Sequence, residues 1–366
     1  MNVLIAAGGT GGHVFPALAV ATRLRAAGVE VHWLGTDRGL EARVTQAANI
    51  PLTVLHGFQG VRGKGITAWL GLPIRLLRAL SQTWRLLRRL RPRAVLTFGG
   101  YVTVPAGLVS RLMGLPILVH EQNAVMGSAN RLLAQWAEST CISFHPTRFA
   151  PEAAVLTGNP VRQEIAQLGT SAPRIAQRDG PLQVLVVGGS LGAMALNRAL
   201  PEVLSRMASK APGGLSVWHQ TGAAGLEETR AAYARYDRQA AGSLGSVRVD
   251  AFIDDMATAY TWADCVVCRA GASTVSELVE IGLPAILVPL PSAIDDHQTA
   301  NARAMVDLGL AVCVPQTPEG FQEALESALS SLSRSQLAGM AQAAQPQQAT
   351  DRFTSLVMPY LLEKSA

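Results

Sequence analysis

A glycine-rich turn near the N-terminus carries residue types that could hold an anion and move a proton. Gly8 to His13 reads Gly-Gly-Thr-Gly-Gly-His, follows a short apolar run and precedes a helical pattern. Glycine lets the backbone approach a ligand, and the N–H groups at a helix start bind anions. His13 could accept a proton at neutral pH, because the ordinary pKa of histidine is about 6.5. The turn matches neither the dinucleotide fingerprint nor the Walker A loop, so a tight turn with a capping or anion-binding His13 remains the alternative.

Two further turns, in the second half of the chain, offer related chemistry. Gly188-Gly-Ser190 follows an apolar strand pattern and matches the first turn in position. The segment Gly271-Ala-Ser-Thr-Val-Ser-Glu277 lies between a strand pattern and a helical pattern. Its hydroxyl and N–H groups could hold phosphate oxygens, and Glu277 could accept hydrogen bonds from a ribose diol. A capping box in the same segment, with Ser273 or Thr274 as the cap, is the alternative and is compatible with both roles.

We expect an arginine, rather than a metal ion, to balance the charge of a diphosphate. Arg162, in Gly158-Asn-Pro-Val-Arg, lies at the expected domain junction and could clamp a diphosphate, although it could also be a surface arginine. Asp295 to Asn301 is dense in polar groups suited to sugar hydroxyls, but Asp-x-Asp occurs nowhere in the chain. Cys265 and Cys268 lack a second ligand pair and fall in a strand pattern, which predicts core cysteines. Helix N-termini and Arg162 would then neutralise the leaving group.

The elements that position these turns follow a repeated order. Residues 2–7 form an apolar strand pattern, residues 16–27 a helical pattern and residues 29–34 a second strand pattern, which together predict a βαβ unit. The same order returns over residues 182–220. A second repeated pattern is the similarity of Phe98-Gly-Gly-Tyr-Val-Thr-Val to Arg269-Ala-Gly-Ala-Ser-Thr-Val. The fold class is therefore α/β, with two doubly wound parallel-sheet domains in tandem.

The chain length and the positions of glycine and proline indicate the domain limits. A chain of 366 residues with 49% hydrophobic residues can fill two cores of ordinary size. Glycine and proline between residues 162 and 181 mark a boundary. We expect a first domain over 1–162, a second over 163–340, and a C-terminal segment over 341–366 whose helix packs back on the first domain.

The basic residues are unevenly distributed. The net charge is +5, yet residues 42–120 contain no Asp or Glu and eleven of the 31 Lys and Arg, which leaves 20 basic against 26 acidic residues elsewhere. One helical stripe in this segment is basic and consists of Arg75, Arg78, Gln82, Arg85 and Arg89. The opposite stripe is apolar and consists of Leu76, Leu77, Leu80, Trp84 and Leu87. A solvated face is the alternative, but the missing acids favour an anionic membrane surface over a nucleic-acid partner.

No apolar run is long enough to span a bilayer. Residues 1–7 lack the basic start of a signal peptide and are interrupted at once by glycines, so a buried first strand is the better interpretation. We therefore expect a cytoplasmic protein.

Six motifs in order make the chain resemble the MurG family of glycosyltransferases over nearly its whole length. They are Gly8-Gly-Thr-Gly-Gly-His-Val-Phe-Pro, Gly99-Gly-Tyr-Val, His120-Glu-Gln-Asn, Gly158-Asn-Pro-Val-Arg, Phe252-Ile-Asp-Asp-Met and the Gly271 segment. The resemblance implies a GT-B fold, in which two Rossmann-like domains face each other across a cleft. It also implies metal-independent, cofactor-free, inverting transfer of N-acetylglucosamine from UDP-N-acetylglucosamine. The acceptor would be the C4 hydroxyl of the lipid-linked muramoyl-pentapeptide, and the enzyme would lie peripherally on the cytoplasmic face of the bacterial membrane.

The resemblance also assigns roles to individual residues. Ile253 would contact the uracil through its backbone, and Glu277 would contact the ribose. The diphosphate would be surrounded by Arg162, Ser190, Ala272, Ser273, Thr274, Val275 and Ser276. Gln298 and Asn123 would contact the N-acetylglucosamine. Thr10, Gly11, Gly12 and His13 would lie where donor and acceptor meet, with His13 the favoured base. The acceptor-side residues would be Tyr101, His120, Glu121 and Asn130.

Three other functions share parts of this pattern. A nicotinamide-dependent oxidoreductase would need the dinucleotide fingerprint and an acid at the end of the second strand, neither of which is present in good form. A UDP-N-acetylglucosamine epimerase would keep the donor site but would not need the basic half. A non-catalytic binder of nucleotide sugars or lipids would need no base.

Overall fold

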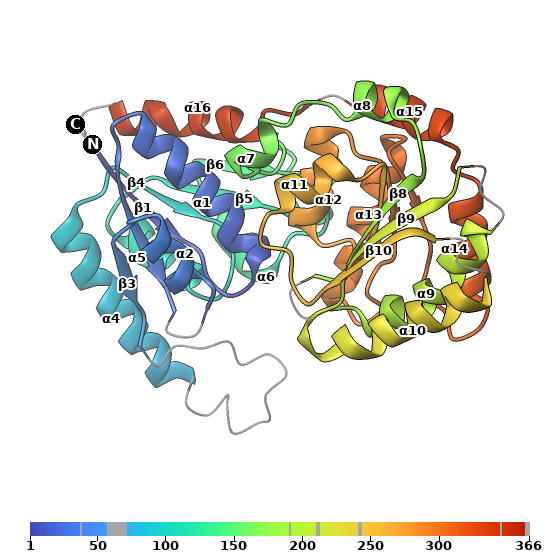
Figure 1. The fold of residues 1–366 in the computed structure, drawn as a ribbon. Helices are drawn as coiled ribbons and strands as arrows, with labels where there is room; N and C mark the ends of the chain where they lie inside the picture. The colour runs from blue at the N-terminus through green and yellow to red at the C-terminus, as the bar shows by residue number, and fades with distance from the viewer. Residues whose placement is uncertain are drawn as a thin grey trace. The chain divides into compact units, whose positions relative to one another are not determined.

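The computed structural model describes residues 1–36, 39–56, 72–189, 192–209, 213–240, 244–344 and 346–362. The chain forms two compact units (Figure 1). The first unit comprises Met1–Arg162 and Gln348–Ala366, and the second comprises Gln163–Gln347. Residue 341, where we expected the C-terminal segment to begin, lies inside helix α15 (Arg334–Gln342), which belongs to the second unit.

The first unit contains a parallel sheet of seven strands within the described residues, in the order β3-β2-β1-β4-β5-β6-β7. The strands in chain order are β1 (Asn2–Ala6), β2 (Glu30–Gly35), β3 (Leu52–Val54), β4 (Ala94–Thr97), β5 (Ile117–Glu121), β6 (Ser139–Ile142) and β7 (Val155–Leu156). Val3 pairs with Val31 of β2 and with Ala94 of β4, so β1 is central. Apart from Asn2 at the start of β1 and Thr97 at the end of β4, these two strands are apolar and buried, as expected for strands covered on both faces.

Helices cover both faces of this sheet. They are α1 (Gly11–Ala26), α2 (Glu41–Ala47), α4 (Leu72–Leu90), α5 (Thr103–Leu112), α6 (Ser128–Ala134) and α16 (Ala349–Leu362). Alternate residues of β1 enter two cores: Val3 and Ile5 join one, and Leu4 and Ala6 join the other. The C-terminal helix α16 lies along α1 (Figure 1) and places Phe353 in the first of these cores. The last helix therefore completes the first unit.

The second unit repeats the plan with six described strands in the order β10-β9-β8-β11-β12-β13. The strands are β8 (Leu182–Val187), β9 (Leu215–Gln220), β10 (Leu244–Asp250), β11 (Cys265–Cys268), β12 (Ala285–Leu287) and β13 (Ala311–Cys313), all paired in parallel. The longer helices are α9 (Met194–Ala208), α10 (Leu226–Gln239), α12 (Ala272–Ile281), α13 (His297–Asp307), α14 (Phe321–Ser330) and α15. The shorter ones are α7 (Gln163–Ala166), α8 (Ala172–Gln177), η1 (Ala223–Gly225), α11 (Met256–Trp262) and η2 (Ile294–Asp296).

Cys265 and Cys268 are core residues, as the strand pattern predicted. Both lie in β11 and are fully buried, and this burial raises the pKa of each thiol to about 12. Neither thiol is therefore a reactive thiolate at neutral pH.

The strand order reverses direction once in each sheet. In the first unit the reversal lies between β1 and β4, and in the second between β8 and β11. Open α/β sheets bind ligands beyond the carboxyl ends of the strands at such a point. The glycine turns after β1 and β4, and their counterparts after β8 and β11, all lie there. The repeated sequence patterns therefore lie at the switch points of the two sheets.

Candidate functional site

The first glycine turn begins helix α1 earlier than its sequence pattern indicated. Helix α1 starts at Gly11 rather than near Pro16, and Thr10 is its exposed, extended N-cap without a side-chain capping bond. His13 therefore lies in the first turn of the helix, at the switch point of the sheet. This position fits a group that meets an anionic ligand at a helix start.

A second glycine pair makes room for the His13 ring. A Cβ on Gly99 would lie 2.8 Å from His13 Cδ2, and Gly100 approaches the carbonyl of Gly8 so closely that a Cβ there would collide with it. Both glycines also have positive φ, which side chains disfavour. The two turns therefore pack backbone to backbone with the imidazole held between them.

The hydrogen bond of His13 settles the tautomer of its neutral ring. Nδ1 lies 3.3 Å from the carbonyl oxygen of Gly8. A carbonyl can only accept, so Nδ1 carries the hydrogen and Nε2 carries the lone pair. The ring is thus oriented to take a proton at Nε2.

A buried glutamate that our sequence analysis missed stands behind the same turn. Glu41 of α2 is 0% exposed and accepts hydrogen bonds from the Gly9 N–H at 3.3 Å and from the Thr36 N–H at 2.8 Å. It also accepts one from the Thr36 hydroxyl at 2.6 Å. Its carboxylate packs so closely on Gly35 and Gly39 that a Cβ at either position would collide with it. A glutamate within a cluster of glycines is the only trace of this arrangement in the sequence.

His120, expected on the acceptor side, is buried in the first unit, and its contact with the acceptor stays a prediction. The ring is 0% exposed and stacks on Phe98, with Phe353 of α16 at its edge. Its Nε2 lies 3.0 Å from the carbonyl oxygen of Gly158. Burial lowers the pKa of His120 to about 4, against a smaller opposing effect of the Gly158 hydrogen bond. His120 is thus neutral and fixes the segment that leads to Arg162.

Glu121 and Asn130 likewise form a buried network instead of an open surface. Glu121 Oε2 accepts from the Gly127 N–H and from the Asn130 amide, both at 2.9 Å. Its Oε1 accepts from the Asn123 N–H at 2.9 Å and from the Asn123 amide at 3.1 Å. Four donors fill the acceptor sites of the carboxylate, which is 2% exposed. The network fixes the start of α6 and the half-buried Asn123, which keeps surface for a ligand.

Tyr101 and Arg162 keep exposed surface in the first unit. Tyr101 follows the Gly99–Gly100 turn, is half-buried and packs against the core beneath α4 and α5. The guanidinium carbon of Arg162 lies 5.1 Å from the centre of the Phe15 ring, a cation–π distance. Phe15 belongs to the second turn of α1, so Arg162 is tied to the helix that carries His13.

In the second unit, one glutamine joins two walls of the predicted donor site. The Gln220 amide donates to the Gly189 carbonyl at 3.0 Å, and its oxygen accepts from the Ile253 N–H at 2.9 Å. Gln220 thus holds the turn after β8 and the segment that was expected to meet the uracil. Ser190, the expected phosphate contact of this turn, lies outside the described residues.

The segment after β11 forms a helix start without the capping box that was the alternative interpretation of its sequence. Gly271 is the N-cap and no side-chain capping bond is present, so Ser273 and Thr274, half-buried, lie within the first turn. Ala272, Val275 and Ser276 are buried, and the Val275 N–H is bound to the Gly271 carbonyl. Gly271, which has no side chain to accept a capping bond, occupies the N-cap position in an extended conformation.

Glu277 is held by a tyrosine rather than by the helix start. The Tyr260 hydroxyl, from α11, donates to Glu277 Oε2 at 2.9 Å, and Tyr260 is 1% exposed. This bond orients the carboxylate that we expected at a ribose. The pairing has no local signature in the sequence, because Tyr260 lies in another element.

Gln298 and its neighbours form the remaining part of the predicted sugar site. The Gln298 side-chain oxygen accepts from the Leu290 N–H at 3.0 Å, which leaves its NH₂ group as the donor end. Asn301, 0% exposed, donates to the Ala270 carbonyl at 3.1 Å and ties α13 to the turn after β11. Asp295 and Asp296 adopt positive φ.

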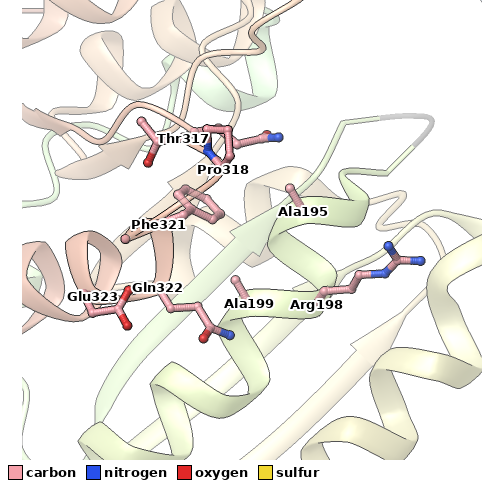
Figure 2. A pocket seen from close by; sticks show the side chains of 10 residues that line it. Ala195, Arg198, Ala199, Thr317, Pro318, Phe321, Gln322 and Glu323 are labelled. Carbon is pink, nitrogen blue, oxygen red and sulfur yellow. The ribbon is translucent and has the colours of Figure 1, made fainter.

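Within the described residues no group of three or more His, Cys, Asp or Glu side chains could hold a metal ion. One open pocket, of about 370 Å³, lies elsewhere in the second unit, between α9 and the start of α14 (Figure 2). No predicted site residue lines it, and Arg198, one of its lining residues, forms an ion pair with Glu228. We base the site on the switch points, because they combine turns, helix starts and polar side chains.

Helix α4 exposes apolar as well as basic side chains, because the apolar stripe is only partly covered. Leu87 is fully buried and Leu76 and Leu80 pack against the core, but Leu77 is 66% and Trp84 39% exposed. Ile74 is also exposed, and so is Leu112 at the end of the neighbouring α5. Arg78, Arg85 and Arg89 are exposed and Arg75 is half-buried. In the part of the chain that the structure describes, no helix is long and apolar enough to cross a membrane.

Known proteins match the chain over both units. Residues 3–142 match the glycosyltransferase family 28 N-terminal domain, and residues 183–357 match its C-terminal domain. The UDP-N-acetylglucosamine--N-acetylmuramyl-(pentapeptide) pyrophosphoryl-undecaprenol N-acetylglucosamine transferase of Alkalilimnicola ehrlichii is 52% identical over 87% of this chain and 86% of its own length.

Solved structures show the same relation. The crystal structure of Acinetobacter baumannii MurG matches with a TM-score of 0.79 and 40% identity, over 98% of this chain and 99% of that one. A UDP-GlcNAc 2-epimerase from Neisseria meningitidis reaches a TM-score of 0.67 over the full length of both chains, but at 14% identity it shares the fold alone.

Proposed function

We propose how the residues of this chain carry out the reaction of its family. The chain belongs to the MurG family of glycosyltransferases and has the GT-B fold. It is a UDP-N-acetylglucosamine-dependent glycosyltransferase of peptidoglycan synthesis. It transfers N-acetylglucosamine to the undecaprenyl-pyrophosphoryl muramoyl-pentapeptide acceptor. We further propose that the C4 hydroxyl of the muramoyl sugar is the attacking group.

The observation that carries the proposal is the orientation of His13. Its Nδ1 hydrogen is engaged by the Gly8 carbonyl, so the Nε2 lone pair is the basic position. The ring lies at the switch point of the first sheet, beside the N-terminus of α1. A general base must reach the proton it removes, and this is where such sheets hold ligands.

In the proposed step, Nε2 of His13 takes the proton from the acceptor hydroxyl as that oxygen attacks the anomeric carbon of the donor. The bond between the anomeric carbon and the diphosphate oxygen breaks, and UDP leaves with the bonding electron pair. Because attack comes from the side opposite the leaving group, the configuration at the anomeric carbon inverts.

We assign acceptor contacts to Tyr101, and we place the turn Thr10–Gly12 where donor and acceptor meet; both keep surface in the first unit. His120, Glu121 and Asn130 act indirectly in this proposal. Their buried network fixes the segments that carry Asn123 and Arg162. A change at any of the three should therefore disturb both donor and acceptor binding.

We assign donor contacts mainly to the second unit. Glu277, oriented by Tyr260, would accept from the ribose hydroxyls, and the Ile253 backbone would meet the uracil. Gln298 would present its NH₂ group to the sugar, together with Asn123. Phosphate oxygens would be held by Ser273, Thr274, Ser190, Arg162 and the start of α12.

We propose that no metal ion takes part. The N-terminus of α12 carries a partial positive charge, and Arg162 adds a full one. Positive groups of this kind can neutralise a leaving diphosphate as a metal would.

We also propose peripheral binding to the cytoplasmic face of the membrane through α4. Exposed Leu77 and Trp84 would enter the interfacial region, while the neighbouring arginines contact anionic headgroups. Both features suit an enzyme whose acceptor is a lipid.

The test is a transfer assay with UDP-N-acetylglucosamine and a short-chain lipid acceptor. We expect UDP release that depends on the acceptor, together with a disaccharide-lipid product. An epimerase would convert the donor without an acceptor, an oxidoreductase would need a nicotinamide, and a binding protein would release no UDP. Any of these three results would refute the proposal.

A further inference from the structure

One peptide unit in the glycine turn is bonded at both ends. The Gly8–Gly9 peptide donates its N–H to Glu41 Oε2 at 3.3 Å, and its carbonyl oxygen lies 3.3 Å from His13 Nδ1. The carboxylate of Glu41 and the imidazole of His13 are therefore joined through a single planar amide. Nothing in the sequence spacing of the three segments indicates this link.

We propose that Glu41 is a positioning residue for His13, acting through the Gly8–Gly9 peptide. The carboxylate polarises the amide, so the Gly8 carbonyl becomes a stronger acceptor for the Nδ1 hydrogen. This holds the ring in the tautomer with its lone pair on Nε2 and stabilises the imidazolium formed when Nε2 takes a proton. The catalytic consequence rests on the proposed role of His13 as base, whereas the link to the ring rests on the contacts alone.

The surroundings of the Glu41 side chain favour a role beyond packing. A buried carboxylate needs several donors, and Thr36 supplies two of the three observed. Gly35 and Gly39 leave room for the carboxylate and for nothing larger. An apolar side chain would fill the same volume without these donors, so the arrangement favours a function for the charge.

The other charged and titratable groups near His13 come from three neighbouring segments. Tyr101 follows the Gly99–Gly100 turn against which the imidazole packs. The guanidinium of Arg162 lies over Phe15, two residues after His13 in α1. The Arg23–Asp351 ion pair joins α1 to α16 at the far end of the helix. Glu41 is thus the acidic group that the turn itself connects to the ring.

The first experiment is Glu41→Gln in the full chain, with histidines labelled for NMR and the His13 signal assigned by His13→Gln. The amide keeps the size and one acceptor oxygen but removes the charge. We expect the His13 titration midpoint to fall by about 0.5 to 1 unit, because the imidazolium loses a nearby anion. Turnover should fall about tenfold, and the acidic limb of the pH–rate profile should move to lower pH. The KM for the donor should change by less than about twofold.

Glu280→Gln is the matched control. Glu280 is also a buried glutamate that accepts a backbone N–H, that of Gln347 at 2.9 Å, but it belongs to α12 of the second unit. This variant should leave both the His13 midpoint and the acidic limb in place. If it shifts them as much as Glu41→Gln does, the effect is a general loss of structure and the proposal is wrong.

The outcomes separate the link from the proposed function. A folded Glu41→Gln protein with an unchanged His13 midpoint overturns the link. A lowered midpoint with an unchanged acidic limb supports the link and refutes His13 as the base. If Glu41→Gln does not fold, Glu41→Asp keeps the charge but draws it back by one methylene. That variant should lower the midpoint by a smaller amount, and no change would overturn the link.

Discussion

Replacing Glu277 should weaken donor binding in a way that the structure makes measurable. Its carboxylate is oriented by the Tyr260 hydroxyl at 2.9 Å and is proposed to accept from the ribose. Glu277→Ala removes a charged acceptor, and hydrogen bonds to charged groups contribute about 1.5 to 3 kcal/mol. Allowing for water that fills the space, we expect a loss of about 1 to 3 kcal/mol, or roughly 5- to 150-fold in Kd.

Tyr260→Phe should produce a smaller loss of the same kind. The carboxylate remains, but it no longer has a fixed orientation, which we expect to cost about 1 kcal/mol or roughly fivefold in Kd. Glu277→Ala also leaves the buried Tyr260 hydroxyl without this partner. The double variant should therefore lose less donor affinity and less stability than the sum of the two single changes.

Isothermal titration with UDP-N-acetylglucosamine and with UDP is the assay, because both ligands carry the ribose. Glu280→Ala is the control: it removes a buried carboxylate three residues later in α12, and should lower Tm without changing either Kd. Donor affinity that is unchanged for both ligands in folded Glu277→Ala would remove this residue from the site.

Three further predictions test other parts of the account. Turnover in EDTA should stay within about twofold of the untreated rate, and a loss restored by magnesium or manganese would contradict the metal-free proposal. Sedimentation with anionic vesicles should fall at least about tenfold when Gln replaces Arg75, Arg78, Arg85 and Arg89, since each contributes about 1 kcal/mol near the surface. The control variant carries the same charge change at Arg198, Arg206, Arg230 and Arg248, and it should still bind the vesicles. An equal loss of binding in both variants would show that binding depends on the net charge of the protein and not on α4. The free energy of unfolding should fall as pH drops from about 6.5 toward 4. Burial lowers the pKa of His120 to about 4, and it lowers the pKa of His219, a fully buried residue of β9, to about 3. In this pH range the unfolded chain therefore takes up protons on both rings that the folded chain does not. Denaturant titrations that give a constant free energy over this range would contradict the neutral, buried state of both rings.

The sequence predicted those features that are local. The strand–glycine–helix order of each half depends on neighbouring residues, and it indicated both sheets and all four turns at the switch points. His13 was found because its motif is continuous. The basic stripe of α4 was predicted from spacing within one helix, which is again local information.

The remaining features depend on contacts between distant segments. Glu41 reaches Gly9 across 32 positions, and Tyr260 reaches Glu277 across 17. His120 is covered by Phe353 from the other end of the chain, so its burial has no signature in its own motif. Leu77 and Trp84 were predicted to lie on the apolar stripe of the helix, but the buried face of α4 is formed by Ala79, Thr83, Leu86 and Leu87. The hydrophobic periodicity predicts which face of a helix is apolar, but it does not predict how much of that face the neighbouring elements cover.

The most direct test of the central claim is the pH–rate profile of His13→Ala under saturating donor and lipid acceptor. The account predicts a fall in turnover of at least about 10²-fold and loss of the histidine-like inflection on the acidic limb, since general-base catalysis contributes about 10²- to 10⁴-fold. Donor Kd measured by titration should change much less. Turnover within a few-fold of the parent, with the acidic limb unchanged, would contradict the account and make His13 a binding or structural residue.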